Sequence, residues 1–219
     1  MANGDLWRIF TTHKGRVVNK WKHYLPIYER YFEKFINQSI NVLEIGIGEG
    51  GSLQMWKAFF GPHARIVGVD VVEEKLSFEE DQIQIRIGDQ SDERFLRSIV
   101  QEFGGFDVII DDGSHQQAHI RTAFDVLYPA LSRNGVYVVE DLHTAYWESY
   151  GGGYLNEESF IEFAKSKIDE LHADYDDSSM SSTKFTRTTV GIHFYDSVCV
   201  FERGQIFNKK APYFGSDQA

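Results

Sequence analysis

The chain has 219 residues and a mass of 25.2 kDa, which is enough for one α/β domain with a substantial core and short for two. Its formal net charge of −11 argues against a broad nucleic-acid footprint or an anionic membrane surface, because both require clustered Lys and Arg. No stretch approaches the roughly 20 apolar residues of a membrane span, and residues 1–10 lack the apolar core of a signal peptide. We therefore expect a soluble, cytosolic protein with a small-molecule partner. The single cysteine, Cys199, lies between valines and is expected to be a buried structural thiol.

Hydrophobic periodicity along the chain alternates between helix-like and strand-like segments. A helix is predicted over residues 24–36, and further helical or mixed segments over 52–60, 92–103 and 117–131. Strands are predicted at 41–45, 65–69, 83–87, 106–110 and 136–139, and the segments 188–195 and 197–202 predict a closing antiparallel hairpin. The alternation indicates an α/β fold with a mostly parallel sheet. We expect one domain with an N-terminal helical cap (1–39), a Rossmann-like core (40–205) and a tail (206–219), and mobile loops at 148–156 and 174–183.

A glycine-rich turn follows the first predicted strand. It contains Gly46 and Gly48, which let the backbone turn sharply and let a ligand approach it closely. Glu44, just before the turn, would disfavour a diphosphate and could pair with a cationic amino group. Asp70 at the second strand end suits two ribose hydroxyls, and Asp89 with Gln90 at the third can reach an adenine edge. The pattern favours a nucleoside, although a bare glycine turn and solvated strand-end acids remain the alternative.

Two acidic clusters lie at the ends of the next two predicted strands. They are Asp111-Asp112-Gly113-Ser114-His115 and Glu140-Asp141-Leu142-His143. Adjacent parallel strands deliver their carboxyl ends to one crevice, so these carboxylates and imidazoles can meet there. Such a carboxylate-rich site favours Mg²⁺ or Mn²⁺ over zinc. Each cluster alone could be an ordinary turn with solvated acids.

The ordered strand-end acids resemble those of the class I S-adenosylmethionine-dependent methyltransferases. Glu44, Gly46 and Gly48 match the first motif of that family, Asp70 its ribose acid, and Asp89 its adenine-side acid. The resemblance covers roughly residues 40–205. It implies a seven-stranded sheet with a closing antiparallel strand, and S-adenosylmethionine bound at Glu44, Gly46, Gly48, Asp70, Asp89 and Gln90, with Asp111 supporting the cofactor or the metal ligands.

The acidic clusters resemble a narrower family, the metal-dependent sugar O-methyltransferases of macrolide antibiotic biosynthesis (the mycinamicin and macrocin type). This resemblance implies Mg²⁺ held by Asp112, Glu140 and Asp141, with His115 as the general base. Imidazole is mostly neutral at physiological pH and can take the proton of a hydroxyl, while a metal chelated by vicinal hydroxyls stabilises the developing alkoxide. His143 is a second candidate for a catalytic role.

An aromatic, glycine-rich loop follows the second cluster. Tyr146, Trp147 and Tyr150 precede Gly151-Gly152-Gly153, so flat rings could stack on a sugar while the glycines let the loop fold over it. The plainer interpretation is a flexible connector whose aromatic rings pack on the domain. Trp21, Tyr24 and Tyr28 at the other end of the chain could cover the ligands or simply pack as a helix face.

The acceptor itself stays open at this stage. Enzymes of the antibiotic-sugar type carry a sizeable N-terminal region, whereas about forty residues precede the first motif here. The glycoside acceptor could therefore be borne by a polyketide or another metabolite, and the protein could form a homo-oligomer. Two alternatives remain: a metal-dependent O-methyltransferase of a catechol-like acceptor, and a non-enzymatic S-adenosylmethionine-binding module.

Overall fold

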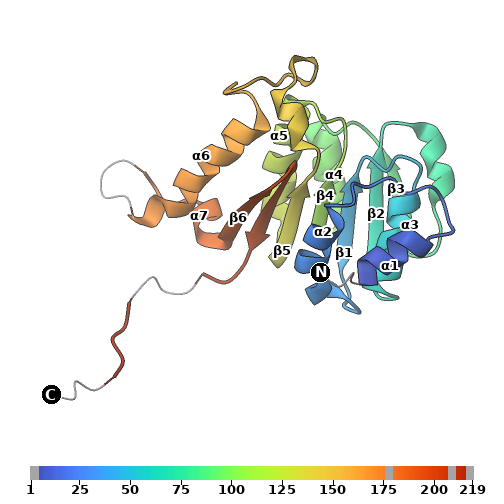
Figure 1. Cartoon of the computed structure of the whole chain (residues 1–219), viewed down its shortest axis with the longest axis horizontal. Coiled ribbons are helices and arrows are strands. Elements are labelled where there is room, and N and C mark those ends of the chain that lie inside the picture. The colour runs from blue at the N-terminus through green and yellow to red at the C-terminus, as the bar shows by residue number, and fades with distance from the viewer. Residues whose placement is uncertain (1–4, 176–179, 207–210, 216–219) are drawn as a thin grey trace.

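A seven-stranded sheet forms the centre of the protein (Figure 1). The computed structural model describes residues 5–175, 180–206 and 211–215. The strands lie in the order β3-β2-β1-β4-β5-β7-β6, with β1 to β5 parallel and β7 antiparallel to both of its neighbours. Their bounds are β1 Asn41–Ile45, β2 Arg65–Asp70, β3 Ile83–Ile87, β4 Phe106–Asp111, β5 Leu131–Val139, β6 Thr189–Tyr195 and β7 Val198–Arg203. The predicted mostly parallel sheet and its closing hairpin are confirmed.

Helices cover both faces of this sheet (Figure 1). One face packs against α1 (Asp5–Thr12), α2 (Leu25–Phe32) and α3 (Gly51–Phe60). The other packs against α4 (Glu93–Phe103), α5 (Gln117–Leu127), α6 (Phe160–His172) and α7 (Lys184–Thr188). The central strands are therefore enclosed on both sides, and the ends of the strands are where polar groups can reach solvent.

The register of the central strands shows how their apolar runs divide between the two faces. Val108 pairs with Val42 on one side and Val136 on the other, and all three contribute to the layer beneath α1, α2 and α3. Their successors in each strand contribute to the opposite layer. Because both faces are buried, the strands read as continuous apolar segments rather than as alternating ones. Cys199 in β7 is fully buried, as predicted.

Several element boundaries differ from the prediction. The helix predicted over 24–36 ends at Phe32 and continues as a 3₁₀ turn, Glu33–Phe35. The segment predicted over 117–131 leaves the α-helix at Leu127, since Pro129 cannot donate to the next helical turn. Helix α6 was not predicted, although its N-cap Ser159 accepts a hydrogen bond from the Glu162 amide. Among the described residues, no helix is both long and apolar enough to cross a membrane.

The two loops expected to be mobile have different outcomes. Within residues 148–156 a 3₁₀ turn forms at Glu148–Tyr150, and the Gly153 amide donates to the Ala145 carbonyl at 2.8 Å. The Asn156 side chain also donates to the Gly151 and Gly152 carbonyls at 3.2 Å. Hydrogen bonds therefore fold this loop back on itself. The segment 174–183 contains residues outside the described ranges.

Candidate active site

Two adjoining hollows occupy the carboxyl-terminal edge of the parallel strands. The first, which we call the glycine-turn hollow, is lined by Ile45, Gly46, Val69, Asp70, Val71, Gly88, Asp89, Gln90, Gly113, Ser114 and His119. The second, the acidic hollow, is lined by Asn19, Lys20, Trp21, Lys22, His23, Asp112, His115, Glu140 and Asp141. Most of the predicted site residues line one of them. The sheet thus brings together the glycine turn and both acidic clusters.

The turn between β1 and α3 depends on the absence of a side chain at Gly46. Its φ is +79°, and a Cβ there would lie 2.0 Å from the carbonyl oxygen of Asp112. Gly48 also has a positive φ, +48°, but a Cβ there would have no heavy atom within 4 Å. Gly46 therefore lets the first turn press directly against the backbone that carries Asp112.

The acids of the glycine-turn hollow are oriented by the backbone. Asp70 accepts hydrogen bonds from the amides of Ile47 at 3.3 Å and Val72 at 3.0 Å, so its carboxylate is fixed between the first two strand ends. Asp89 accepts from the amide and hydroxyl of Ser91, and these bonds hold the pKa of Asp89 below its ordinary value. Both carboxylates line the hollow as hydrogen-bond acceptors. His119, at the same hollow, shares a 2.9 Å hydrogen bond with Ser114.

Asp111 and Gln90 form a buried pair beneath the hollow. The Gln90 amide donates to Asp111 Oδ1 at 2.5 Å, and its oxygen accepts from the Ser114 backbone at 3.0 Å. Burial raises the pKa of Asp111 to about 7, despite the hydrogen bonds that it accepts from Gly113, Gln90 and Tyr137. This network connects the end of β3 to the first acidic cluster. Asp111 therefore supports Gln90 from within the protein.

Asp112, His115 and Asp141 converge in the acidic hollow. One ligand atom from each lies within 4.8 Å of the other two. His115 Nε2 is 3.9 Å from Asp112 Oδ1 and 3.6 Å from Asp141 Oδ2. The three side chains are about one-fifth exposed, so the cluster is accessible from solvent. Two hard carboxylate oxygens with an imidazole beside them form a donor set suited to a divalent cation.

The backbones of His115 and Asp141 both adopt the left-handed conformation, with φ of +57° and +54°. This conformation is strained for residues other than glycine and tends to occur at functional sites. Neighbouring side chains hold it: Gln117 donates to the His115 carbonyl at 3.0 Å, and the Thr144 hydroxyl donates to the Asp141 carbonyl at 2.7 Å. This backbone conformation directs both side chains into the acidic hollow.

A lysine from the N-terminal segment lies within the acidic cluster. Lys20 Nζ is 2.7 Å from Asp112 Oδ2, 2.9 and 3.1 Å from the two oxygens of Glu140, and 3.0 Å from Glu44 Oε1. The Lys20 and Glu140 side chains are 2% exposed and Glu44 is fully buried, so this network is shielded from water. Burial alone would lower the pKa of Lys20, but Asp112, Glu140 and Glu44 together raise it well above its ordinary value.

This network separates two of the predicted ligands from the third. Asp112 and Asp141 face His115, whereas both oxygens of Glu140 are held by Lys20. Glu44, predicted to pair with a donor amino group, accepts a 2.6 Å hydrogen bond from Ser52 and adjoins Lys20. The roles of Glu140 as a metal ligand and Glu44 as a donor contact stay predictions.

Tyr24, at the start of α2, is the second N-terminal residue in the cluster. Its hydroxyl donates to Asp141 Oδ1 at 2.7 Å, and burial raises the pKa of this phenol well above its ordinary value. From the sequence, Tyr24 was predicted only to cover the ligands or to pack on a helix face, and Lys20 was not predicted to belong to the site. The only sequence signal is that Lys20 stands close to Trp21 and Tyr24. This signal does not predict its contacts with Asp112 and Glu140, which lie 92 and 120 positions away.

His143 and the aromatic loop border the acidic hollow without entering the trio. His143 Nδ1 is 2.6 Å from the Ser197 hydroxyl, and its ring centroid lies 4.9 Å from that of Trp147. The Tyr150 ring lies 6.3 Å from that of His115. Tyr146 and Trp147 are each about half exposed. The loop thus presents aromatic surface next to His115, while His143 is engaged by Ser197.

Comparisons with known proteins find relatives in sequence and in structure. No family model matches the chain. It is 38% identical, across 96% of the chain and 57% of the relative, to the 8-demethyl-8-(2-methoxy-alpha-L-rhamnosyl)-tetracenomycin-C 3'-O-methyltransferase of Streptomyces olivaceus. It is 40% identical over 194 residues, 83% of the chain and 48% of the relative, to the mycinamicin VI 2''-O-methyltransferase of Micromonospora griseorubida.

A solved structure matches in fold as well as in sequence. The MycE methyltransferase of the mycinamycin biosynthetic pathway, in complex with Mg, SAH and mycinamycin VI, is 37% identical and superposes with a TM-score of 0.80. The match covers 92% of this chain and 53% of that one. The chain has the fold of the class I methyltransferases. It spans about half the length of the curated relatives it matches.

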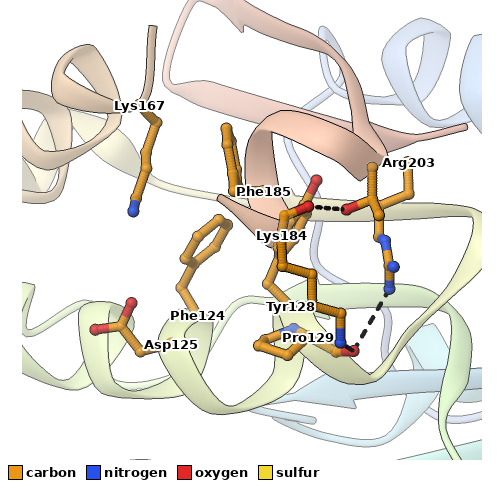
Figure 2. Close-up of a pocket in the computed structure, with 9 residues that line it drawn as sticks. Phe124, Asp125, Tyr128, Pro129, Lys167, Lys184, Phe185 and Arg203 are labelled. Carbon is orange, nitrogen blue, oxygen red and sulfur yellow. Dashed lines mark hydrogen bonds between the residues drawn. The ribbon is translucent and has the colours of Figure 1, made fainter. Parts of the chain in front are cut away.

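A further hollow is lined mainly by residues of α5, α6 and α7 (Figure 2). Two of its cations, Lys184 and Arg203, donate to the Pro129 carbonyl, and a third, Lys167, donates to Glu170 at 2.7 Å. None of the predicted site residues lines it. Its lining residues are Phe124, Asp125, Tyr128, Pro129, Lys167, Lys184, Phe185, Thr188 and Arg203. The candidate active site is therefore the pair of hollows at the carboxyl ends of the strands.

Proposed function

We propose that the protein is a Mg²⁺-dependent S-adenosylmethionine O-methyltransferase that acts on a sugar hydroxyl of a glycosylated natural product. The observation that carries the proposal is the convergence of Asp112, His115 and Asp141 directly beside the glycine-turn hollow. Its relatives support the acceptor class, since their names describe O-methylation of mycinamicin and rhamnosyl tetracenomycin. A glycoside acceptor is thus the first to test.

The donor would occupy the glycine-turn hollow. Asp70 would accept hydrogen bonds from the ribose hydroxyls, and Asp89 with Gln90 would face the adenine side. Gly46 and Gly48 would admit the donor close to the backbone, and Glu44, whose Oε1 lies 3.0 Å from Lys20 Nζ, would pair with the amino group. Asp111 would support Gln90 from beneath.

The acidic hollow fits a divalent cation. Asp112 and Asp141 each present one carboxylate oxygen toward His115, and Mg²⁺ prefers oxygen ligands. We propose Asp112 and Asp141 as ligands, with Glu140 as the third; Mn²⁺ could substitute. When bound, the metal would lower the pKa of a chelated sugar hydroxyl and orient it.

His115 would act as the general base. Its Nε2 lies 3.9 Å from Asp112 Oδ1 and 3.6 Å from Asp141 Oδ2, beside the place where the acceptor hydroxyl would release its proton. As that proton passes to His115, the acceptor oxygen forms a bond to the methyl carbon and the carbon–sulfur bond of the donor breaks, which leaves S-adenosylhomocysteine. Tyr146, Trp147 and Tyr150 would hold the sugar by stacking. His143, which lies beside Trp147 of the aromatic loop, would assist the base or hold the acceptor.

The test is transfer of labelled methyl groups to a panel of rhamnosyl and macrolide glycosides, with Mg²⁺ and with EDTA. We expect transfer to at least one glycoside, complete loss in EDTA, and loss in Asp112→Asn with donor affinity retained. Asp169→Asn, an exposed acid on α6, is the matched control and should stay active. Turnover of catechol without any glycoside turnover would overturn the sugar assignment, and full activity in EDTA would overturn the metal assignment.

A further inference from the structure

Among the described residues, Lys20 is the one cation that contacts Glu44, Asp112 and Glu140 together. Glu44 lies one residue before the end of β1, Asp112 follows β4 and Glu140 follows β5, so the ammonium joins the carboxyl ends of three strands. Two of these acids belong to the proposed metal site and the third to the proposed donor site. Lys20 itself belongs to neither strand nor helix but to the segment between α1 and α2.

The N-terminal segment divides the oxygens of the cluster into two sets. Lys20 holds Asp112 Oδ2 and Tyr24 holds Asp141 Oδ1, each at 2.7 Å. The second oxygens of these carboxylates, Asp112 Oδ1 and Asp141 Oδ2, are the ones that face His115. The carboxylates are thus already oriented, with one oxygen occupied and the other available.

The charge of Lys20 affects both the stability of the carboxylate cluster and its affinity for a metal ion. Several carboxylates buried together without a cation repel one another and lose the solvation of water. Lys20 offsets that cost when no metal is present. A divalent cation bound to the free oxygen of Asp112 would share this carboxylate with the Lys20 ammonium, and two positive charges at such short range repel strongly in a buried site.

We propose that Lys20 is a built-in counter-ion of the acidic hollow, which assembles the carboxylates before the metal binds and then competes with it for Asp112 and Glu140. The inference rests on the proposed metal site. Lys20 is a positioning residue: it keeps the hollow formed in the metal-free protein, and it keeps the affinity for the metal moderate, so that the ion can exchange.

The test is direct titration of the folded full chain with Mn²⁺, followed by electron paramagnetic resonance of the free ion and without acceptor or turnover. Lys20→Met removes the ammonium and keeps an unbranched side chain one atom shorter, whereas Lys20→Arg keeps the charge. We expect Lys20→Met to bind Mn²⁺ at least about tenfold more tightly than the wild type, and Lys20→Arg to bind no more tightly. Lys14→Met removes an exposed ammonium from the same segment and should bind Mn²⁺ as the wild type does.

Thermal unfolding with increasing Mn²⁺ gives a second readout. Metal-free Lys20→Met should unfold at a lower temperature than the wild type, and Mn²⁺ should raise its midpoint more than it raises that of the wild type, because a tighter ligand stabilises more. A Lys20→Met protein that is unfolded without metal and folds when Mn²⁺ is added also supports the proposal. One that stays unfolded in millimolar Mn²⁺ overturns it.

Failure of this inference differs from failure of the proposed function. If wild-type protein binds Mn²⁺ through Asp112 but folded Lys20→Met binds it equally or less tightly, Lys20 does not compete with the metal. If the wild type binds no Mn²⁺, or if Asp112→Asn leaves binding unchanged, the metal site itself is wrong.

Discussion

Gly46→Ala tests whether the position of the first turn determines the position of Asp112 in the acidic hollow. Gly48→Ala is its matched control. Both positions have positive φ, so alanine is strained at each. Only at Gly46 would the new Cβ meet backbone, 2.0 Å from the Asp112 carbonyl oxygen and 2.7 Å from the Gly113 Cα. At Gly48 the new methyl group has open space.

The expected magnitudes follow from these two surroundings. The left-handed conformation costs alanine about 1–2 kcal/mol, so Gly48→Ala should lose about that much free energy of unfolding. At Gly46 the overlap with backbone adds roughly 1–3 kcal/mol, for a total loss of about 2–5 kcal/mol. Relief of the overlap must move Asp112, so Mn²⁺ binding should weaken in Gly46→Ala and stay unchanged in Gly48→Ala.

Urea unfolding monitored by tryptophan fluorescence gives the free energies, and titrations with Mn²⁺ and S-adenosylhomocysteine give the affinities. The reasoning is refuted if the two variants lose equal stability and Gly46→Ala binds Mn²⁺ as tightly as the wild type. Such a result would mean that the turn moves independently of the strand end that carries Asp112.

Three further predictions concern the acidic hollow and its support. His115→Ala should lower turnover by about 10²–10⁴-fold with an unchanged dissociation constant for S-adenosylhomocysteine, and wild-type turnover would contradict the base role. Tyr24→Phe removes the hydrogen bond to Asp141 and should weaken Mn²⁺ binding by about tenfold or more in a folded protein, which a titration measures; equal affinity would count against it. Burial raises the folded-state pKa of Asp111 to about 7, above its unfolded value, so its contribution to stability is full below about pH 4 and is lost as the pH rises through 7. From pH 4 to pH 8, the free energy of unfolding of Asp111→Asn, measured with urea, should therefore rise relative to that of the wild type by up to about 4 kcal/mol. Parallel pH profiles of the two proteins would contradict this.

The sheet was predictable because its signals are local. Apolar runs such as Phe106–Asp111 are bounded by glycines and acids, and parallel strands place those acids at one edge. The same rule predicted that Asp112 and Asp141 would meet, and their trio with His115 bears this out. Helix α6 was missed because its buried residues, Phe160, Phe163 and Ala164, form only one helical repeat beside a mostly polar remainder.

Lys20 could not be predicted by such local rules. Its contacts with Asp112 and Glu140 span 92 and 120 positions, and the segment around it has no periodicity that fixes its direction. The contacts of Glu140 are likewise a result of packing: whether both of its oxygens pair with Lys20 depends on where the N-terminal segment crosses the strand ends. The acids were visible in the sequence, but the division of their oxygens was not.

The left-handed backbones of His115 and Asp141 set a limit on how this domain can be improved. Glycine at either position would relieve the backbone strain, but it would delete the imidazole proposed as the base or the carboxylate proposed as a metal ligand, which also accepts the Tyr24 hydrogen bond. Selection for an unstrained backbone alone would therefore remove groups on which the proposed function depends. A consensus design that optimises stability must hold these two positions fixed, because the proposed chemistry depends on them.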